Sequence, residues 1–277
     1  MHRVLRRAIT LVVFLALFAA TVPSPAAAAG GWKYTALGDS IGTGLFAFKG
    51  YVPRYRDYAA ADTGVSVSLT NLSQNGWTST DLLNALKTNS TFRSSVQGSQ
   101  IVTWDIGGND LRAARDSYKG GTCGDPDNQA CLRATVKSLE SNWDGIAAEI
   151  LTLRPISSTI IRTMDIYNPY VNTDKAADSW HDDNGDLVDD GPGGPTDFVI
   201  FKTYLDEVNT YIAGTRTRFG IPVAGVYAAF NGPDGTADPR DSPRRYIAFD
   251  GLHPNDTGHK VIADLLRGLR YAPLSTR

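Results

Sequence analysis

The order in which strand-like and helix-like segments alternate is the strongest constraint on how this chain can fold. Short apolar, β-rich runs predict five strands, at residues 33–37, 65–72, 100–106, 158–164 and 222–227. Helical spacing of apolar residues predicts helices between or after them, at 52–61, 79–87, 132–153, 197–219 and 255–269. This alternation predicts the α/β class: a three-layer α/β/α sandwich with a central, mostly parallel five-stranded sheet.

Three irregular stretches, 115–130, 167–196 and 231–245, are longer than a connection between two elements needs. In such a sandwich, long loops at the strand ends shape the binding face. We therefore expect these loops around the functional site.

The N-terminal segment has the composition of a secretory signal. Arg3, Arg6 and Arg7 precede an apolar stretch, and small residues at 26–29 suit cleavage before residue 30. A single-pass anchor is the alternative, but the apolar core of this segment is shorter than the roughly 20 residues that span a bilayer. We expect residues 1–29 to be a signal peptide and residues 30–277 to be one secreted domain with no stable membrane span.

Charge argues against one class of partner. The chain has 27 Lys and Arg and 29 Asp and Glu, which give a formal net charge of −2. Its basic residues form no cluster that could follow a phosphate backbone. Nucleic acid is therefore not expected as a partner.

Cys123 and Cys131 are the only two cysteines, and they lie in one segment rich in Gly, Asp and Pro. Outside the cytosol, such a close pair predicts a disulfide. A zinc site would need about four ligands, which do not cluster here, and two free thiols are the remaining alternative.

Ser40 stands in Gly38-Asp39-Ser40-Ile41-Gly42, which fits the pattern G-x-S-x-G of a nucleophile on a strand-to-helix turn. A predicted strand precedes this serine, and the residues after it can open a helix. A serine that only caps that helix is the alternative.

A serine nucleophile needs a base, and three histidines follow the N-terminal segment. His181 lies in a polar acidic loop, and His259 falls in the first turn of the last predicted helix, where a capping or packing role fits better. His253 has Asp250 three residues before it. On one tight loop, D-x-x-H lets the carboxylate accept from Nδ1 and leaves Nε2 facing outward. Asp250 and His253 are therefore the predicted acid and base.

The order of these residues resembles that of the GDSL, or SGNH, hydrolase superfamily, in which the nucleophile follows the first strand and the acid and base share a loop near the C-terminus. The resemblance covers nearly all of the chain after residue 29. The matching blocks, in order, are Gly38-Asp39-Ser40, "NLSQNGWTS", Gly107-Gly108-Asn109-Asp110 and Asp250-Gly251-Leu252-His253. It implies the flavodoxin-like sandwich of SGNH hydrolases.

The resemblance also implies a serine esterase or lipase that hydrolyses carboxylic esters through an acyl-enzyme and needs no cofactor. Ser40, His253 and Asp250 would form the triad, while Ser40 N–H, Gly76 N–H and the Asn109 side chain would form the oxyanion hole. The enzyme would act as a monomer on a small-molecule, lipid or acylated-sugar ester. A carbohydrate acetylesterase or an acyltransferase would use the same residues, whereas a non-catalytic carbohydrate-binding protein would not need them.

Two further features bear on ligands. Phe46, Phe48, Tyr51 and Trp77 lie near two of the blocks and suit an apolar or sugar-stacking wall, although most such side chains are simply core. In the acidic loop, oxygen-bearing residues at alternate positions could hold Ca²⁺, and these are Asp182, Asn184 and Asp186. A solvated acidic loop is the alternative, because an EF-hand-type loop would have glycine where Leu187 stands.

Overall fold

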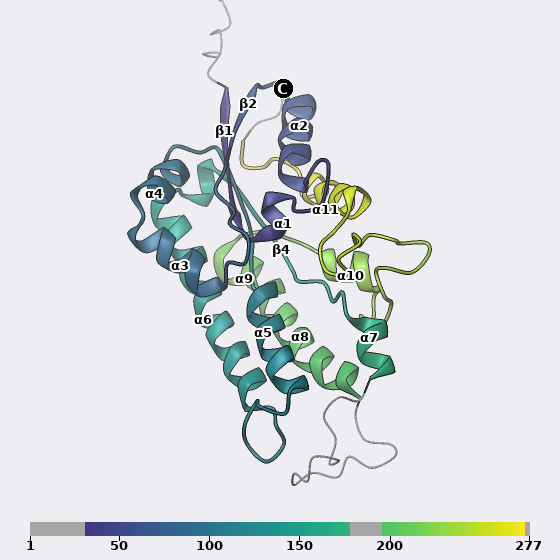
Figure 1. Ribbon diagram of the computed structural model, residues 1–277. Coiled ribbons are helices and arrows are strands. Elements are labelled where there is room, and N and C mark those ends of the chain that lie inside the picture. Colours follow the sequence, from purple (N-terminus) through teal and green to yellow (C-terminus); the bar gives the residue numbers. More distant parts are fainter. Residues whose placement is uncertain (1–30, 178–195, 275–277) are drawn as a thin grey trace, which may run out of the picture. The chain divides into compact units, whose positions relative to one another are not determined.

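The computed structural model describes residues 31–177 and 196–274 (Figure 1). The described residues belong to one compact unit, which begins at Gly31 and contains the whole sheet. The expected signal peptide, residues 1–29, lies outside the described residues. So do His181 and the calcium-ligand candidates Asp182, Asn184 and Asp186.

Five strands form one sheet in the order β2-β1-β3-β4-β5, and all of its strand pairs are parallel. The strands are β1 Trp32–Gly38, β2 Val67–Asn71, β3 Ile101–Asp105, β4 Ile160–Met164 and β5 Val223–Ala224. Because β1 stands between β2 and β3, the chain reverses its direction of winding there, and α/β proteins bind ligands at such a switch point. The register pairs Gly38 with Asp105, so β1 and β3 end at the same level.

Helices cover both faces of the sheet, as the three-layer prediction requires (Figure 1). They are α1 Ser40–Thr43, α2 Tyr51–Thr63, α3 Ser79–Thr88, α4 Ser90–Gln97, α5 Gly108–Lys119, α6 Ala130–Leu153, α7 Val171–Ala176, α8 Asp197–Ala213, α9 Thr215–Phe219, α10 Val226–Asn231 and α11 Asp256–Gly268, with a 3₁₀ turn at Ile156–Ser158. Alternate side chains of a strand point to opposite faces, and in β1 Leu37 joins one core while Ala36 joins the other. The first core includes α3–α6 and α8, and the second includes α2, α10 and α11.

The five strands and the predicted α/β/α sandwich are confirmed, with differences at several helices. The predicted helix 197–219 is interrupted at Gly214, which ends α8 and precedes α9. The last predicted strand, 222–227, keeps only two paired residues, because the chain is already helical from Val226. Helices α4, α5, α7 and α10 were not predicted, and the end of α5 occupies part of the stretch 115–130 that was expected to be irregular.

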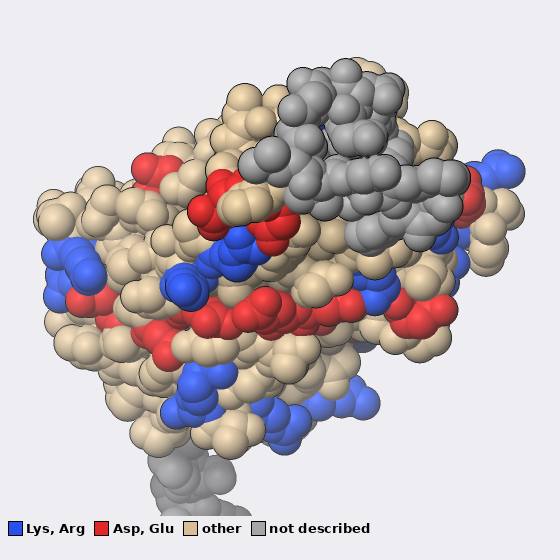
Figure 2. All heavy atoms as spheres, turned by 90° about the horizontal axis from the view of Figure 1, so that it is seen from below, with Lys and Arg blue, Asp and Glu red and all other residues tan. Residues whose placement is uncertain are grey.

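The charged side chains are mixed on the face seen from below in Figure 2. A band of Asp and Glu lies between groups of Lys and Arg there. The described part of this face thus has no continuous basic surface of the kind that follows a phosphate backbone. In residues 31–177 and 196–274, no helix is long and apolar enough to cross a membrane.

Candidate active site

The turn after β1 holds Ser40 in a fixed position. Gly38 has φ +144°, and a Cβ on it would lie 2.4 Å from the carbonyl oxygen of Asp105, so only glycine fits there. Asp39 caps α1 by accepting a hydrogen bond from the Ile41 N–H at 2.8 Å. Ser40 is the first residue of α1 and is buried. Its hydroxyl therefore lies at the carboxyl end of a central strand.

Asp250, His253 and Ser40 form a continuous chain of hydrogen bonds. Oδ2 of Asp250 lies 2.5 Å from Nδ1 of His253, and Nε2 of His253 lies 2.8 Å from Oγ of Ser40. The carboxylate is suited to accept the Nδ1 proton, which leaves Nε2 free to accept the serine proton. This geometry can activate the hydroxyl as a nucleophile.

The loop before α11 is held in place by its own backbone. Ile247 and Pro254 form an antiparallel bridge, and the Ala248 N–H donates to the carbonyl of His253 at 2.8 Å. From across the site, the hydroxyl of the half-buried Tyr167 donates to the carbonyl of Leu252 at 2.7 Å. These bonds fix the imidazole of His253 beside Ser40.

The carboxylate of Asp250 is stabilised in its charged form. Burial opposes ionisation, but hydrogen bonds from the His253 ring and from the N–H groups of Leu252 and His253 outweigh it and lower the pKa of Asp250. Asp250 is therefore charged at neutral pH and can stabilise an imidazolium at His253.

His259 has a structural role, as its place in the sequence predicted. Its ring is buried, and Nδ1 accepts the N–H of Tyr51 at 3.2 Å. Burial, together with the nearby charge of Arg54, lowers its pKa to about 4. The ring is therefore neutral at pH 7 and supports the start of α2, where Tyr51 is the first residue.

Three N–H donors of the predicted oxyanion hole come from the ends of β1, β2 and β3. Asn109 lies in the first turn of α5 and lines the cavity beside Ser40, while one N–H of its side chain donates to the carbonyl of Trp77 at 2.9 Å. Gly76 precedes Trp77 and has φ +80°. Among the described residues, the N–H groups of Ser40 and Gly76 donate no hydrogen bond, and the second N–H of Asn109 is likewise without an acceptor.

Neighbouring bonds hold the turn that carries Gly76 close to the site. The hydroxyl of Thr43 in α1 donates to the side chain of Asn75 at 2.7 Å, and Asn109 bonds the carbonyl of Trp77. Asn75, directly before Gly76, is therefore bonded to α1, and Trp77, directly after it, is bonded to Asn109. Its own atoms do not line the cavity.

A buried carboxyl pair beneath the nucleophile was not predicted. Asp105, the last residue of β3, accepts the Tyr51 hydroxyl at 2.5 Å and the Gly42 N–H at 3.0 Å. Burial raises its pKa to about 6, although hydrogen bonds from Tyr51, Asp39 and Gly42 favour its charge. Burial and the charge of Asp105 raise the pKa of Asp39 well above its usual range. A carboxylate at the end of an otherwise apolar strand was the sequence signal for this pair.

A cavity opens beside Ser40 and His253 and encloses about 720 Å³, including space open to solvent. Its wall beyond the two catalytic candidates is largely apolar and comes from α5, from α8 and from the segment after β4. The apolar and aromatic side chains of the wall are Ile41, Ile106, Leu111, Met164, Ile166, Tyr167, Pro169, Tyr170, Phe201, Leu205 and Leu252. The cavity can accommodate an apolar group bonded to an ester carbonyl at Ser40.

Buried ion pairs hold the α7 side of this wall. Arg115 of α5 pairs with Asp174 of α7, whose side chain is fully buried, and the Arg115 guanidinium lies 3.9 Å from the ring centroid of Tyr170. Lys119 lies 3.6 Å from Asp174 and also pairs with Asp197 at the start of α8. Ion pairs thus connect α5, α7 and α8 behind the aromatic part of the cavity wall.

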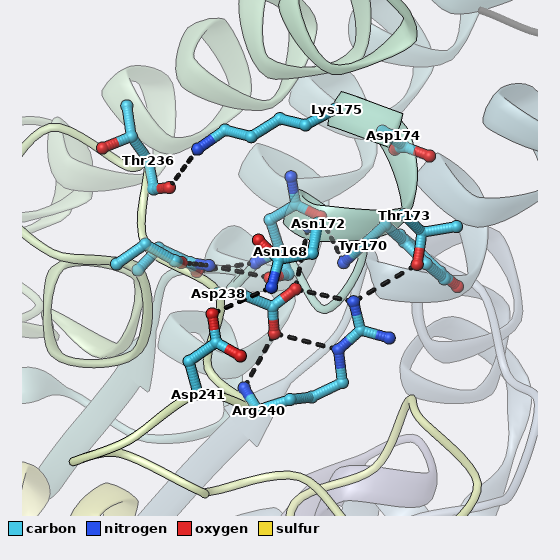
Figure 3. Close-up of polar contacts among 12 residues, drawn as sticks. Asn168, Tyr170, Asn172, Thr173, Asp174, Lys175, Thr236, Asp238, Arg240 and Asp241 are labelled. Carbon is cyan, nitrogen blue, oxygen red and sulfur yellow. Dashed lines mark hydrogen bonds and ion pairs between the residues drawn. The ribbon is translucent and has the colours of Figure 1, made fainter. Parts of the chain in front are cut away.

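The other side of α7 is fixed to the loop after α10 (Figure 3). Asp238 accepts the Asn172 N–H at 2.8 Å and pairs with Arg240, which also reaches the hydroxyl of Thr173. Lys175 donates to the carbonyl of Thr236 at 2.7 Å (Figure 3). The loop 231–245 therefore supports α7 but contributes no residue to the cavity, which corrects the expectation that it would shape the binding face.

The four aromatic residues predicted to form a wall do not line the cavity. Trp77 packs on Phe92 with ring centroids 5.3 Å apart, and Tyr51 is buried under the turn. Phe46 and Phe48 are exposed to solvent. The wall is built instead from residues of α5, α8 and the segment after β4, which carried no motif in the sequence.

The remaining predicted sites lie away from the cavity. A disulfide joins Cys123 and Cys131, and it closes the loop between α5 and α6. Within the described ranges, no group of His, Cys, Asp or Glu side chains could hold a metal ion.

Comparison with known proteins identifies a family. The sequence pattern of the GDSL-like Lipase/Acylhydrolase family matches residues 36–261. No match was found among curated proteins.

Several solved structures share the fold at low sequence identity. A lipase from a goat rumen metagenome has a TM-score of 0.68 at 21% identity, over 88% of this chain and 100% of that one. An acetylxylan esterase from Geobacillus stearothermophilus has a TM-score of 0.56 at 17% identity, over 89% and 98% of the two chains. An extracellular lipase from Streptomyces rimosus has a TM-score of 0.54 at 19% identity, over 86% and 99%.

Proposed function

Because this chain belongs to the GDSL-like lipase/acylhydrolase family, whose members hydrolyse esters, we propose that it is a secreted serine esterase with Ser40 as nucleophile. The observation that carries the proposal is the chain of hydrogen bonds from Asp250 through His253 to the Ser40 hydroxyl. Ser40 and the pair Asp250 and His253 come from opposite ends of the sequence. A serine that only capped a helix would need neither the histidine nor the aspartate.

In the proposed reaction, His253 Nε2 accepts the proton of Ser40 Oγ as that oxygen attacks the ester carbonyl. The carbonyl oxygen becomes an oxyanion, which would be stabilised by the N–H groups of Ser40, Gly76 and Asn109. The protonated His253 then donates its proton to the departing alcohol, which leaves an acyl group on Ser40. Water attacks this acyl-enzyme with His253 again as base, and the carboxylic acid is released.

The cavity supports an acyl group longer than acetyl, because its wall beside Ser40 is apolar over several side chains. A carbohydrate acetylesterase is the second candidate, since an acetylxylan esterase shares the fold. An acyltransferase would replace water by another alcohol at the same site. The proposed enzyme acts as a monomer, without a metal or other cofactor.

The test begins with a fluorophosphonate, which should label the protein at Ser40 and leave Ser40→Ala unlabelled. Ser73→Ala is a matched control, because Ser73 is also buried but has no base beside it. Rates are then measured with p-nitrophenyl esters from acetate to octanoate, with and without an added alcohol. They distinguish an esterase for longer acyl groups, an acetylesterase and an acyltransferase. Labelling at another residue, or full activity of Ser40→Ala, would refute the proposal.

A further inference from the structure

Exposed phenylalanines adjoin the catalytic candidates. Phe48 is 99% exposed, Phe249 is 87% exposed and Phe46 is 48% exposed. The rings of Phe46 and Phe249 touch at 4.9 Å between centroids, and Phe46 also contacts the ring of His253 at 5.5 Å. Phe46 and Phe249 are therefore continuous with the site through His253, which itself lines the cavity. Phe48 lies two positions after Phe46 in the chain. Phe46, Phe48 and Phe249 are called the aromatic patch below.

The backbone holds the aromatic patch outward. The N–H groups of Phe48 and Lys49 both donate to the carboxylate of Asp256 at 3.0 Å, so the segment between α1 and α2 is tied to the first residue of α11 (Figure 1). Phe46 has φ +63°, a left-handed conformation that is unfavourable for an aromatic residue. Strained backbone of this kind persists where the surrounding structure enforces it, and it is concentrated at functional sites.

The ring geometry favours an apolar phase over a sugar. Stacking on a sugar ring requires an open, flat aromatic face, but Phe46 and Phe249 meet at 65° and Phe46 meets His253 at 66°. In an edge-to-face contact, the edge of one ring covers part of the face of the other, and the two rings form a wedge. A wedge of phenylalanine rings suits insertion among acyl chains.

Most of the charges beside the aromatic patch are paired. Lys49 and Arg56 both pair with Asp57, at 2.6 and 2.5 Å, and Arg54 pairs with Asp256 at 2.9 Å. These groups leave an excess of one basic side chain, well short of the basic cluster that binds anionic lipid. A lipid surface without net charge therefore suits the patch.

We propose that the aromatic patch docks the enzyme on an uncharged or zwitterionic lipid surface that contains its ester substrate. The proposal rests on the proposed function, because it takes a lipid surface that contains esters as the partner. A fluid phase in contact with the patch can supply substrate next to His253, whereas a folded protein or a second copy seated there would obstruct that approach. A phenylalanine side chain moved from water into acyl chains gains enough free energy for about a tenfold change in partition.

Binding is measured separately from catalysis, with phosphatidylcholine vesicles and the full chain carrying Ser40→Ala. All variants keep the same N-terminal segment and are purified in the same form, so that segment contributes equally to each. Phe48→Ser and Phe249→Ser should each lower the partition about tenfold, while Phe48→Leu should largely preserve it. Val199→Ser is the matched control, because Val199 is a 48% exposed apolar residue on α8, outside the aromatic patch, and its loss should leave the partition within about twofold.

With Ser40 present, Phe48→Ser should slow hydrolysis of an ester embedded in these vesicles and leave kcat/KM for soluble p-nitrophenyl butyrate within about twofold. Vesicle binding that Phe48→Ser does not change would overturn the proposal. So would binding that is lost at high salt, a dimer that the substitution dissociates, or affinity for soluble acetylated xylooligosaccharides that depends on Phe48. If Ser40 fails to react with the fluorophosphonate while vesicle binding persists, the proposed function fails and the docking surface stands.

Discussion

At the scale of the residue, the two histidines of the C-terminal region differ in their surroundings and should differ in effect. His253→Ala removes the base that contacts Ser40 and should lower kcat by about 10⁴-fold or more. His259→Ala leaves the Tyr51 N–H without its acceptor and should instead cost about 1–3 kcal/mol of unfolding free energy. Steady-state kinetics and urea unfolding of both variants separate the roles, and a larger kcat loss in His259→Ala would reverse the assignment.

Asn109 is predicted to act mainly in the transition state. Its free N–H should bond the carbonyl oxygen most strongly once negative charge develops there, so Asn109→Ala should lower kcat by about 10²- to 10³-fold with a much smaller change in KM. Asn142→Ala is a control, because Asn142 also donates to neighbouring side chains but lies on α6, away from the cavity. Near-normal kcat with a lower melting temperature would show that Asn109 only bonds the Trp77 carbonyl.

Asp105 should make stability depend on pH in a characteristic direction. Its pKa is raised from 3.8 to about 6, so the folded state holds its proton more tightly than the unfolded state. This contribution is complete below about pH 4 and is lost as pH rises to about 6, by up to about 3 kcal/mol. Asp105→Asn cannot titrate, and the unfolding free energies of wild type and variant should therefore diverge across this window. Urea unfolding at closely spaced pH values measures the difference, and parallel curves would contradict it.

Asp105→Asn should also disturb positioning. The two carboxylate oxygens of Asp105 accept hydrogen bonds from three donors, whereas an asparagine side chain has only one oxygen. The resulting misplacement of the Ser40 turn should lower kcat by about tenfold or more. Tyr51→Phe removes one of these donors and should produce a smaller loss. Unchanged kcat in both variants would show that the carboxyl pair has no influence on the nucleophile.

At the scale of the element, the short helix α7 depends on charges behind the cavity wall. Asp174→Ala removes the buried partner of Arg115, leaves the exposed Asp116 at 3.3 Å, and should cost about 3 kcal/mol. Because Arg115 lies against Tyr170, the substitution should also raise KM for long acyl esters more than for acetate. Lys260→Ala breaks an exposed pair on α11 and should cost less than about 1 kcal/mol. Thermal unfolding tests the first claim, and equal costs for the two variants would exclude a special role of the buried pair.

The elements also explain which parts of the fold the sequence could predict. Most residues of β1 and all residues of β3 and β4 are buried, and apolar, β-branched and aromatic side chains predominate in them, which is a local signal for a strand. Helix α5 begins at Gly108 with the polar residues Asn109 and Asp110, and its apolar residues are few, so local pattern did not identify it. Helix α7 has six residues and is held by tertiary ion pairs, which no local pattern encodes.

The candidate site, like the fold, was only partly predictable from the sequence. Ser40, Asp250 and His253 were predictable, because their chemistry requires particular residue types at short spacings. The cavity wall was not, because any apolar side chains can build it, and Phe201 and Leu205 reach it only through the packing of α8. The phenylalanines that do lie near a motif, Phe46 and Phe48, point to solvent instead.

At the scale of the whole molecule, export is predicted to precede activity. Cleavage before Gly30 should leave a mature N-terminus two residues ahead of β1, which begins at Trp32. N-terminal sequencing of protein from the culture medium checks this, and a non-reduced digest of the same sample should contain the linked Cys123–Cys131 peptide. Protein that keeps residues 1–29 and stays with the cells would favour the anchor instead.

Ser40 and His253 are 213 positions apart in the sequence, yet their side chains are in contact. During synthesis Ser40, the proposed nucleophile, leaves the ribosome early, whereas His253, its proposed base, follows only after every strand of the sheet has been made. A nascent or truncated chain that ends before residue 253 can therefore contain the whole sheet and would still be inert toward esters. Reactivity at Ser40 would thus report that synthesis has passed residue 253 and that the chain has folded, and the producing cell would be protected from the hydrolase until then.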